Sequence, residues 1–209
     1  MALRAVVFDY GMVLTDGQNA EAHAELMRLT GLEHEQFEAL YWVRRHEYDL
    51  GLLTGLAFWH DFLLRAGIAE NPALAEELNA VDARMWTSAN PEMLAWQLAL
   101  KARGLKTAIL SNMGDNVLAR MERTFDWLSC FDVLVWSFQL RLAKPDPAIY
   151  QYTLEQLGVE AGETLFLDDR ESNVEAAQAL GIRALQFSTV DRLRQEILST
   201  GLAAELPLP

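Results

Sequence analysis

The sequence predicts an α/β fold: a parallel sheet with helices on both faces, and an α-helical segment inserted after the first strand. Short apolar runs typical of buried strands recur at residues 5–9, 106–110, 132–136, 164–168 and 183–187. The later runs alternate with helical patterns, as in sheets of parallel strands. The first two runs are about 90 residues apart, which is too far for a single crossover helix.

The first strand ends in a residue that can carry chemistry. The run Ala5-Val6-Val7-Phe8 is followed by Asp9 and then by a turn at Tyr10-Gly11. In an α/β sheet, ligands bind outside the carboxyl ends of the strands. Asp9 is therefore a candidate functional residue.

The segment between the first two strands looks entirely helical. Helices are expected at Ala20–Leu29, Glu33–Tyr48, Leu56–Ala66 and Pro72–Trp86. Their larger apolar residues are enough for the core of a small bundle: Met27, Phe37, Leu40, Tyr41, Phe58, Trp59, Phe62, Leu63, Leu78, Val81, Met85 and Trp86. We therefore expect two domains, an α/β core at 1–15 and 89–209 and a helical insertion at 16–88.

Helices between the later strands have clear start and stop signals. Asn90-Pro91 is an N-cap followed by proline at the first helical position, and Gly104 closes that helix. Patterns at Pro147–Leu157 and Ser172–Leu180 each end at a glycine. These helices would cover the two faces of the sheet.

A second acidic site follows the fourth apolar run. Thr164-Leu165-Phe166-Leu167 ends in Asp168-Asp169, so three carboxylates lie at two strand ends. Holding them together is costly without a cation, and oxygen ligands of this kind suit Mg²⁺. We expect a magnesium site here.

Composition limits the partners and the compartment. The net charge of −13 argues against nucleic acid or an anionic membrane as a partner. Any anion site must therefore be made locally, from a metal, a lysine and backbone N–H groups. The single cysteine, Cys130, rules out an internal disulfide. With no apolar run near the roughly 18 residues of a membrane span and no signal peptide before the first strand, we expect a cytoplasmic protein.

Four segments in one order resemble a known family. They are Phe8-Asp9-Tyr10-Gly11-Met12-Val13-Leu14, Ile109-Leu110-Ser111-Asn112, Lys144-Pro145-Asp146-Pro147, and Phe166-Leu167-Asp168-Asp169 running on to Asn173. Each is weak alone, but four in order at strand ends are specific. The pattern resembles the haloacid dehalogenase superfamily of hydrolases, which implies a Rossmann-like core. The insertion looks like the helical cap of its first subclass. Within the superfamily, the sequence resembles sugar-1-phosphate phosphatases and the phosphatase domain of epoxide hydrolase.

The resemblance implies a phosphatase that acts on a small phosphorylated metabolite, with sugar phosphates among the candidates. Asp9 would attack phosphorus and form an aspartyl-phosphate. Mg²⁺ would be held by Asp9, the Gly11 carbonyl and Asp169, with Asp168 in support. The remaining roles are phosphoryl binding by Ser111 and Asn112, neutralisation of the phosphate by Lys144, and orientation of the acidic pair by Asn173.

Gly11 departs from the pattern of most phosphatases of this superfamily, which have a second Asp two residues after the nucleophile. That residue protonates the leaving oxygen, so its loss removes the usual general acid. A phosphatase could still act on a good leaving group or use an acid from the cap, and His46 is the sequence candidate for that acid and for substrate contact. The arginines beside it, Arg44 and Arg45, are as consistent with a solvated helix face.

Two alternatives remain open. A 2-haloacid dehalogenase needs neither proton nor metal for its leaving halide, which fits Gly11 but leaves Asp168-Asp169 unexplained. Dehalogenases of this superfamily also place Tyr-Gly-Thr one residue later than Tyr10-Gly11 falls here. The other alternative is a non-catalytic relative that binds metal or phosphate in a regulatory role, and the intact nucleophile, lysine and acidic pair argue against it.

Overall fold

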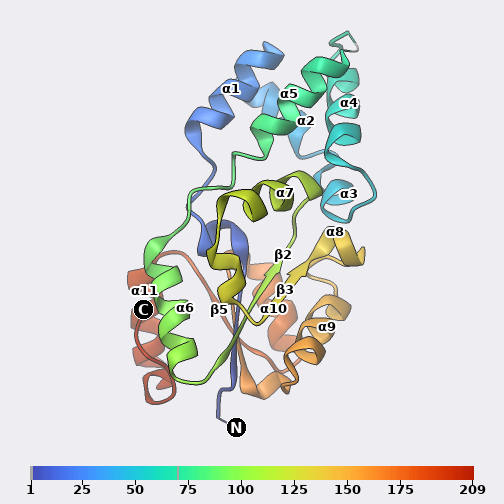
Figure 1. The fold of residues 1–209 in the computed structure, drawn as a ribbon. Helices are drawn as coiled ribbons and strands as arrows, with labels where there is room; N and C mark the ends of the chain where they lie inside the picture. The colour runs from blue at the N-terminus through green and yellow to red at the C-terminus, as the bar shows by residue number, and fades with distance from the viewer. Residues whose placement is uncertain (1, 70) are drawn as a thin grey trace.

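Five parallel strands form a sheet in the order β3-β2-β1-β4-β5 (Figure 1). The computed structural model describes residues 2–69 and 71–209. The strands are β1 (Ala5–Phe8), β2 (Lys106–Ser111), β3 (Val133–Trp136), β4 (Thr164–Asp168) and β5 (Arg183–Gln186). All five lie within a residue of where the apolar runs predicted them, so the predicted fold class is confirmed.

Helices pack on both faces of this sheet. Side chains of α6 (Pro91–Ala102), α7 (Asp115–Thr124) and α11 (Val190–Ser199) join one apolar cluster, and those of α9 (Pro147–Leu157) and α10 (Glu171–Ala179) join another. Strand β1 serves both clusters, because successive side chains of a strand point to opposite faces. Val6 and Phe8 belong to the first cluster, and Ala5 and Val7 to the second.

The inserted segment has an apolar core of its own, formed by residues between Ala22 and Met85 with Trp86 packed against it. Its helices are α1 (Ala20–Thr30), α2 (His34–Tyr41), α3 (Arg45–Asp49), α4 (Gly55–Arg65) and α5 (Pro72–Asp82). Figure 1 shows α1, α2, α4 and α5 gathered at the end of the molecule opposite the N-terminus. All twelve apolar residues expected to build a bundle core lie in or against this cluster.

The two connections to the insertion run side by side. Thr15 and Ala89 form an isolated antiparallel bridge. On either side of it, Asp16 N–H donates to Ser88 O at 2.8 Å and Asn90 N–H to Leu14 O at 2.9 Å. The bridge falls at the predicted boundaries, which supports a division into a core and a cap at 16–88. That division stays a prediction.

The helices differ from the sequence expectation at several points. The helix expected at Pro72–Trp86 ends at Asp82 and is followed by turns. The single helix expected at Glu33–Tyr48 is two helices, α2 and α3, which are separated at residues 42–44. No glycine or proline marks this break. Helices α7, α11 and the short α8 (Ser137–Leu140) were not predicted.

Hydrogen bonds join the cap to the N-terminus of α7. The Tyr48 hydroxyl donates to Asp115 Oδ1 at 3.2 Å and to Asn116 Oδ1, and Gly55 N–H donates to Asp115 Oδ1 at 2.9 Å. Gly114 allows this approach, because a Cβ there would lie 2.0 Å from the Tyr48 ring. The cap therefore lies against the carboxyl side of the sheet with no space left between Gly114 and Tyr48.

Replacing Gly114 by Ala should therefore weaken the packing of the cap against α7 and destabilise the protein. The added methyl group must displace the fully buried Tyr48 ring, and overpacking of this kind costs about 1–3 kcal/mol. Thermal unfolding would measure the loss. Gly17→Ala is a matched control, since its Cβ would meet only Met12 Sδ at 3.6 Å. Equal melting temperatures for the two variants would contradict the prediction.

Within the described residues, no helix is both long enough and apolar enough to cross a membrane.

Candidate active site

Three neighbouring strands bring the predicted site residues to one edge of the sheet. Asp9 follows β1, Ser111 ends β2 and Asp168 ends β4, and β1 lies between β2 and β4. Asp9 and Ser111 line one cavity together with Lys144 and Asp169. Parallel strands thus place residues that are far apart in the sequence around one space, where α/β sheets bind ligands.

Lys144 links two of the carboxylates. Its ammonium lies 2.8 Å from Asp9 Oδ1 and 2.6 Å from Asp168 Oδ2. Lys144 and Asp168 are almost completely buried. Burial lowers the pKa of Lys144, but the charges of Asp9 and Asp168 outweigh it and hold that pKa above its usual value. Lys144 is therefore a fixed positive charge in the site.

Asp168 is saturated by hydrogen bonds. Its oxygens accept from Arg170 N–H at 2.9 Å, from Asn173 Nδ2 at 2.9 and 3.1 Å, and from Lys144. Asn173 thus orients Asp168. A carboxylate held by so many donors has little capacity left for a ligand, so the structure is consistent with a supporting part for Asp168.

The other two carboxylates have oxygens left over. Asp9 Oδ1 accepts from Tyr10 N–H at 2.7 Å and from Lys144, whereas Asp9 Oδ2 has no partner among the described residues. Apart from its own backbone N–H, no described residue donates a hydrogen bond to the Asp169 carboxylate. Ligand oxygens of Asp9, Asp168 and Asp169 lie within 4.8 Å of one another. Asp9 and Asp169 therefore each keep an acceptor for a ligand within this cluster.

Burial raises the pKa of Asp9 to about 7, with Lys144 opposing and Asp168 and Asp169 adding to the rise. Burial and the charge of Asp168 also raise the pKa of Asp169. Lys144 and Arg170 oppose the charge of three carboxylates, so the cluster keeps an excess of negative charge that a divalent cation would relieve. The donor set is oxygen only, which fits Mg²⁺ better than softer metals. When bound, Mg²⁺ would supply charge neutralisation for a phosphoryl group.

This charge balance predicts how metal-free stability depends on pH. An Asp whose pKa rises from 3.8 unfolded to about 7 folded stabilises the fold below about pH 4, and that stability is lost as the pH rises through about 7. Mg²⁺ favours the ionised carboxylate. It should therefore raise the melting temperature more at pH 8 than at pH 5, measured against EDTA, and Asp9→Asn should reduce that difference. An equal Mg²⁺ effect at both pH values would contradict the assignment.

Ser111 and Asn112 have different surroundings. Ser111 is buried at the end of β2 and lines the cavity, and no described residue takes its hydroxyl as a partner. Asn112 also lines the cavity, but its amide is engaged with the backbone of Lys144, donating to Lys144 O and accepting from Lys144 N–H at 2.8 Å each. Asn112 therefore positions Lys144, and its backbone N–H and second amide N–H remain for a ligand.

The structure does not bring His46 to the cavity. His46 is exposed on α3 and is not one of the lining residues. Its neighbour Arg45 is buried and lines the cavity, with Asp49 one turn further along and Trp42 before it. One residue along a helix rotates a side chain by about 100°, so Arg45 and His46 point in different directions. Sequence reasoning weighed Arg45 and missed Asp49.

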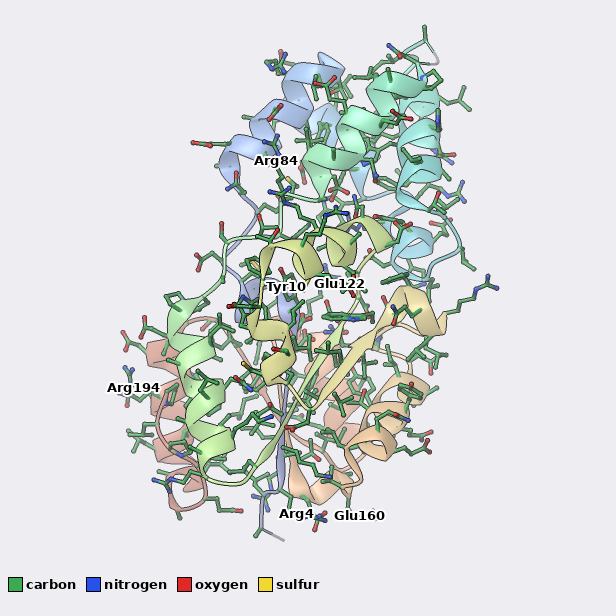
Figure 2. All side chains as sticks on the ribbon, viewed as in Figure 1. Arg4, Tyr10, Arg84, Glu122, Glu160 and Arg194 are labelled. Carbon is green, nitrogen blue, oxygen red and sulfur yellow. The ribbon has the colours of Figure 1, made fainter. Side chains whose placement is uncertain are left out.

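Gly11 lies beside Trp86, which also lines the cavity. Its φ is −65°, so the position does not require glycine, and a Cβ would lie 3.6 Å from the Trp86 ring. The adjoining Tyr10, labelled in Figure 2 beneath α7, donates from its hydroxyl to Trp86 O at 2.5 Å. The turn after β1 is thus tied to the end of the cap, and nothing in it supplies the missing second carboxylate.

Comparison with known proteins identifies the family. The sequence model of the haloacid dehalogenase-like hydrolases matches residues 3–181. The chain belongs to this family. A phosphatase of Mycobacterium tuberculosis is 31% identical over 201 residues, which cover 88% of this chain and 87% of that protein. An (S)-2-haloacid dehalogenase of Pseudomonas is 29% identical, with 91% and 86% covered. The predicted superfamily is confirmed, and the protein is a haloacid dehalogenase-like hydrolase.

The chain is also similar to an epoxide hydrolase, to a further enzyme of the family and to a second dehalogenase. Mouse bifunctional epoxide hydrolase 2 is 33% identical over 151 residues, which are 69% of this chain and 27% of that protein. A haloacid dehalogenase family enzyme of Bacteroides thetaiotaomicron, solved with magnesium and inorganic phosphate, has a TM-score of 0.74 at 22% identity, covering 88% of this chain and 93% of its own. L-2-haloacid dehalogenase of Xanthobacter autotrophicus has a TM-score of 0.68 at 22% identity, covering 99% and 85%. These two structures support the fold alone.

Proposed function

We propose that this hydrolase cleaves small phosphomonoesters in a Mg²⁺-dependent reaction that passes through an aspartyl-phosphate on Asp9, and that it does so in the cytoplasm. The observation that carries the proposal is the acidic cluster. Asp169 and the second oxygen of Asp9 are free acceptors beside a fully paired Asp168. This arrangement is costly unless it binds a cation.

Each residue has a part in the proposed reaction. One carboxylate oxygen of Asp9 attacks phosphorus, and the bond to the leaving oxygen breaks. Lys144 and the Ser111 hydroxyl neutralise and hold the phosphoryl oxygens. Asp168 fixes Lys144 through the 2.6 Å contact. Water then attacks phosphorus, which releases inorganic phosphate and restores Asp9. A sugar phosphate is one candidate among the substrates.

Dehalogenation is the second candidate, because relatives of similar identity carry that activity. A halide leaves without a proton, which would account for Gly11. A dehalogenase has no use for the cation that the Asp169 cluster favours, so the phosphatase is the better supported function.

A substrate screen tests the proposal. Phosphate release from a panel of phosphorylated metabolites would be measured with Mg²⁺ and with EDTA, alongside halide release from 2-chloropropionate. We expect phosphate release only with Mg²⁺, and its loss in Asp169→Asn. That variant should fold normally, because it removes one of several like charges. Full activity in EDTA would refute the metal site, and halide release without phosphate release would favour the dehalogenase.

A further inference from the structure

The proposed reaction lacks a proton donor at Gly11, and the cap supplies a carboxyl group to the same cavity. We propose that Asp49 is the general acid of this enzyme and protonates the leaving-group oxygen. This inference rests on the proposed phosphatase function. Asp49 lines the cavity together with Asp9 and Gly11, although it lies on α3 in the cap.

The backbone of Asp49 is anchored to the core. The hydroxyl of Ser137, at the start of α8, donates to Asp49 O at 2.5 Å and accepts from Met113 N–H at 3.0 Å. Two residues further on, Gly51 packs so closely that a Cβ would lie 2.3 Å from Phe138 O. Asp49 is therefore held at a fixed place relative to the strand ends, as a catalytic group must be.

The side chain of Asp49 is held at one oxygen only. Asp49 Oδ1 accepts from Arg45 Nε at 2.9 Å. Asp49 Oδ2 has no partner among the described residues, and the side chain is 16% exposed in a position that lines the cavity. One oxygen is thus oriented by an arginine, while the other is available to carry a proton toward a substrate.

The charges around Asp49 favour a protonated carboxyl group. Arg45 lies between the carboxylates of Asp49 and Asp82. Its Nη1 is 3.7 Å from Asp82 Oδ1. Asp82 is fully buried and accepts from the Tyr41 hydroxyl at 2.8 Å and from Asn116 Nδ2 at 3.0 Å. One arginine cannot neutralise both carboxylates, which favours a proton on Asp49.

The pKa of Asp49 agrees with this balance. Burial raises the pKa of Asp49, Arg45 opposes the rise, Asp82 adds to it, and Arg170 on the core side of the cavity opposes it. The pKa of Asp49 is raised overall, as are the pKa values of carboxylic acids that act as proton donors near neutral pH. Tyr41 and Tyr48, which pack on Arg45, stay neutral because burial raises the pKa of both.

Protons are conserved over the two half-reactions, which form and then hydrolyse the aspartyl-phosphate. Asp9 forms its bond to phosphorus while the bond to the leaving oxygen breaks, and Asp49 gives that oxygen its proton. The alcohol leaves neutral, and the Asp49 carboxylate stays paired with Arg45. Water then attacks phosphorus, its proton passes to Asp49, and the bond from phosphorus to Asp9 breaks. Inorganic phosphate leaves, and both aspartates are restored.

Leaving-group dependence tests Asp49 as the acid. The turnover of wild type, Asp49→Asn and Asp49→Glu would be measured on p-nitrophenyl phosphate and on an alkyl phosphate with Mg²⁺. A good leaving group needs no proton. Asp49→Asn should therefore lower kcat about 10²–10⁴-fold on the alkyl phosphate and less than about tenfold on p-nitrophenyl phosphate. Wild-type kcat should fall at alkaline pH as the Asp49 carboxyl group loses its proton, and Asp49→Asn should abolish that fall. Asp49→Glu should restore part of the alkyl activity.

The controls separate the possible failures. Asp61→Asn, a cap carboxylate that pairs with Arg44 and Arg65 outside the cavity, should behave as wild type. Equal losses on both substrates in Asp49→Asn, or no loss, would overturn the acid role while leaving the phosphatase proposal intact. Failure of wild type on both substrates would overturn the phosphatase proposal and the acid role with it. Infrared difference spectra of Asp49→Asn and wild type give a readout independent of activity: the band of a protonated carboxyl group should be lost.

Discussion

Replacing Asp9 by Asn is expected to reduce phosphate release by roughly 10⁴-fold or more, because loss of a covalent nucleophile has effects of at least this size. Asparagine keeps the shape of the side chain and its contact with Tyr10 N–H, but it has no attacking charge. Binding of phosphate in the presence of Mg²⁺ should persist in part, through Lys144 and Ser111. Steady-state kinetics and calorimetry measure the two effects separately.

The same substitution should not unfold the protein. Burial raises the pKa of Asp9 to about 7, so ionised Asp9 destabilises the folded state above that pH. The neutral amide of asparagine removes this destabilisation. Asp191→Asn is a suitable control, because the Asp191 side chain is 90% exposed. Near-native turnover in Asp9→Asn would exclude the covalent mechanism.

Replacing Lys144 by Met is expected to damage both activity and stability. The charge that faces Asp9 and Asp168 is lost, and removing one partner of a buried ion pair typically costs about 3–5 kcal/mol. Turnover should fall about 10²–10³-fold, as it does when one preorganised donor to a charged transition state is removed. Mg²⁺ should stabilise this variant more than wild type, because the cation would then replace the positive charge lost beside Asp9 and Asp168.

Lys101→Met provides the comparison for Lys144. Lys101 pairs with Asp132 at 2.8 Å on the surface, where an ion pair contributes up to about 1 kcal/mol. Denaturant unfolding of both variants, with and without Mg²⁺, compares the contribution of the buried ion pairs to the free energy of unfolding with that of the exposed pair. A loss of stability in Lys144→Met no larger than in Lys101→Met would mean that the buried lysine is not paired as described.

The sheet and its acidic edge were predictable because short-range signals specify them. Runs such as Ala5–Phe8 and Thr164–Leu167 are apolar throughout, as strands buried on both faces must be. Parallel pairing then requires their carboxyl ends, and hence Asp9 and Asp168, to meet at one edge. The inserted helices were also visible in the sequence, since their apolar residues follow helical spacing.

The cap residues that line the cavity could not be predicted from the sequence. Which residue of Arg44, Arg45 and His46 faces the cavity depends on the break between α2 and α3, and no glycine or proline marks that break. Asp49 reaches the cavity through long-range contacts, above all the hydrogen bond from Ser137. Gly11 is a similar case: its negative φ, which makes Gly11→Asp a feasible substitution, can only be read from the backbone.

Trapping of the covalent intermediate tests the central claim most directly. The protein would be mixed with p-nitrophenyl phosphate and Mg²⁺, quenched with acid during the first turnover, digested and analysed by mass spectrometry. We predict a phosphoryl group on the peptide that contains Asp9, absent with EDTA and absent in Asp9→Asn. An unmodified Asp9 peptide during active phosphate release, or modification of Asp9 by 2-chloropropionate instead, would contradict the phosphatase mechanism.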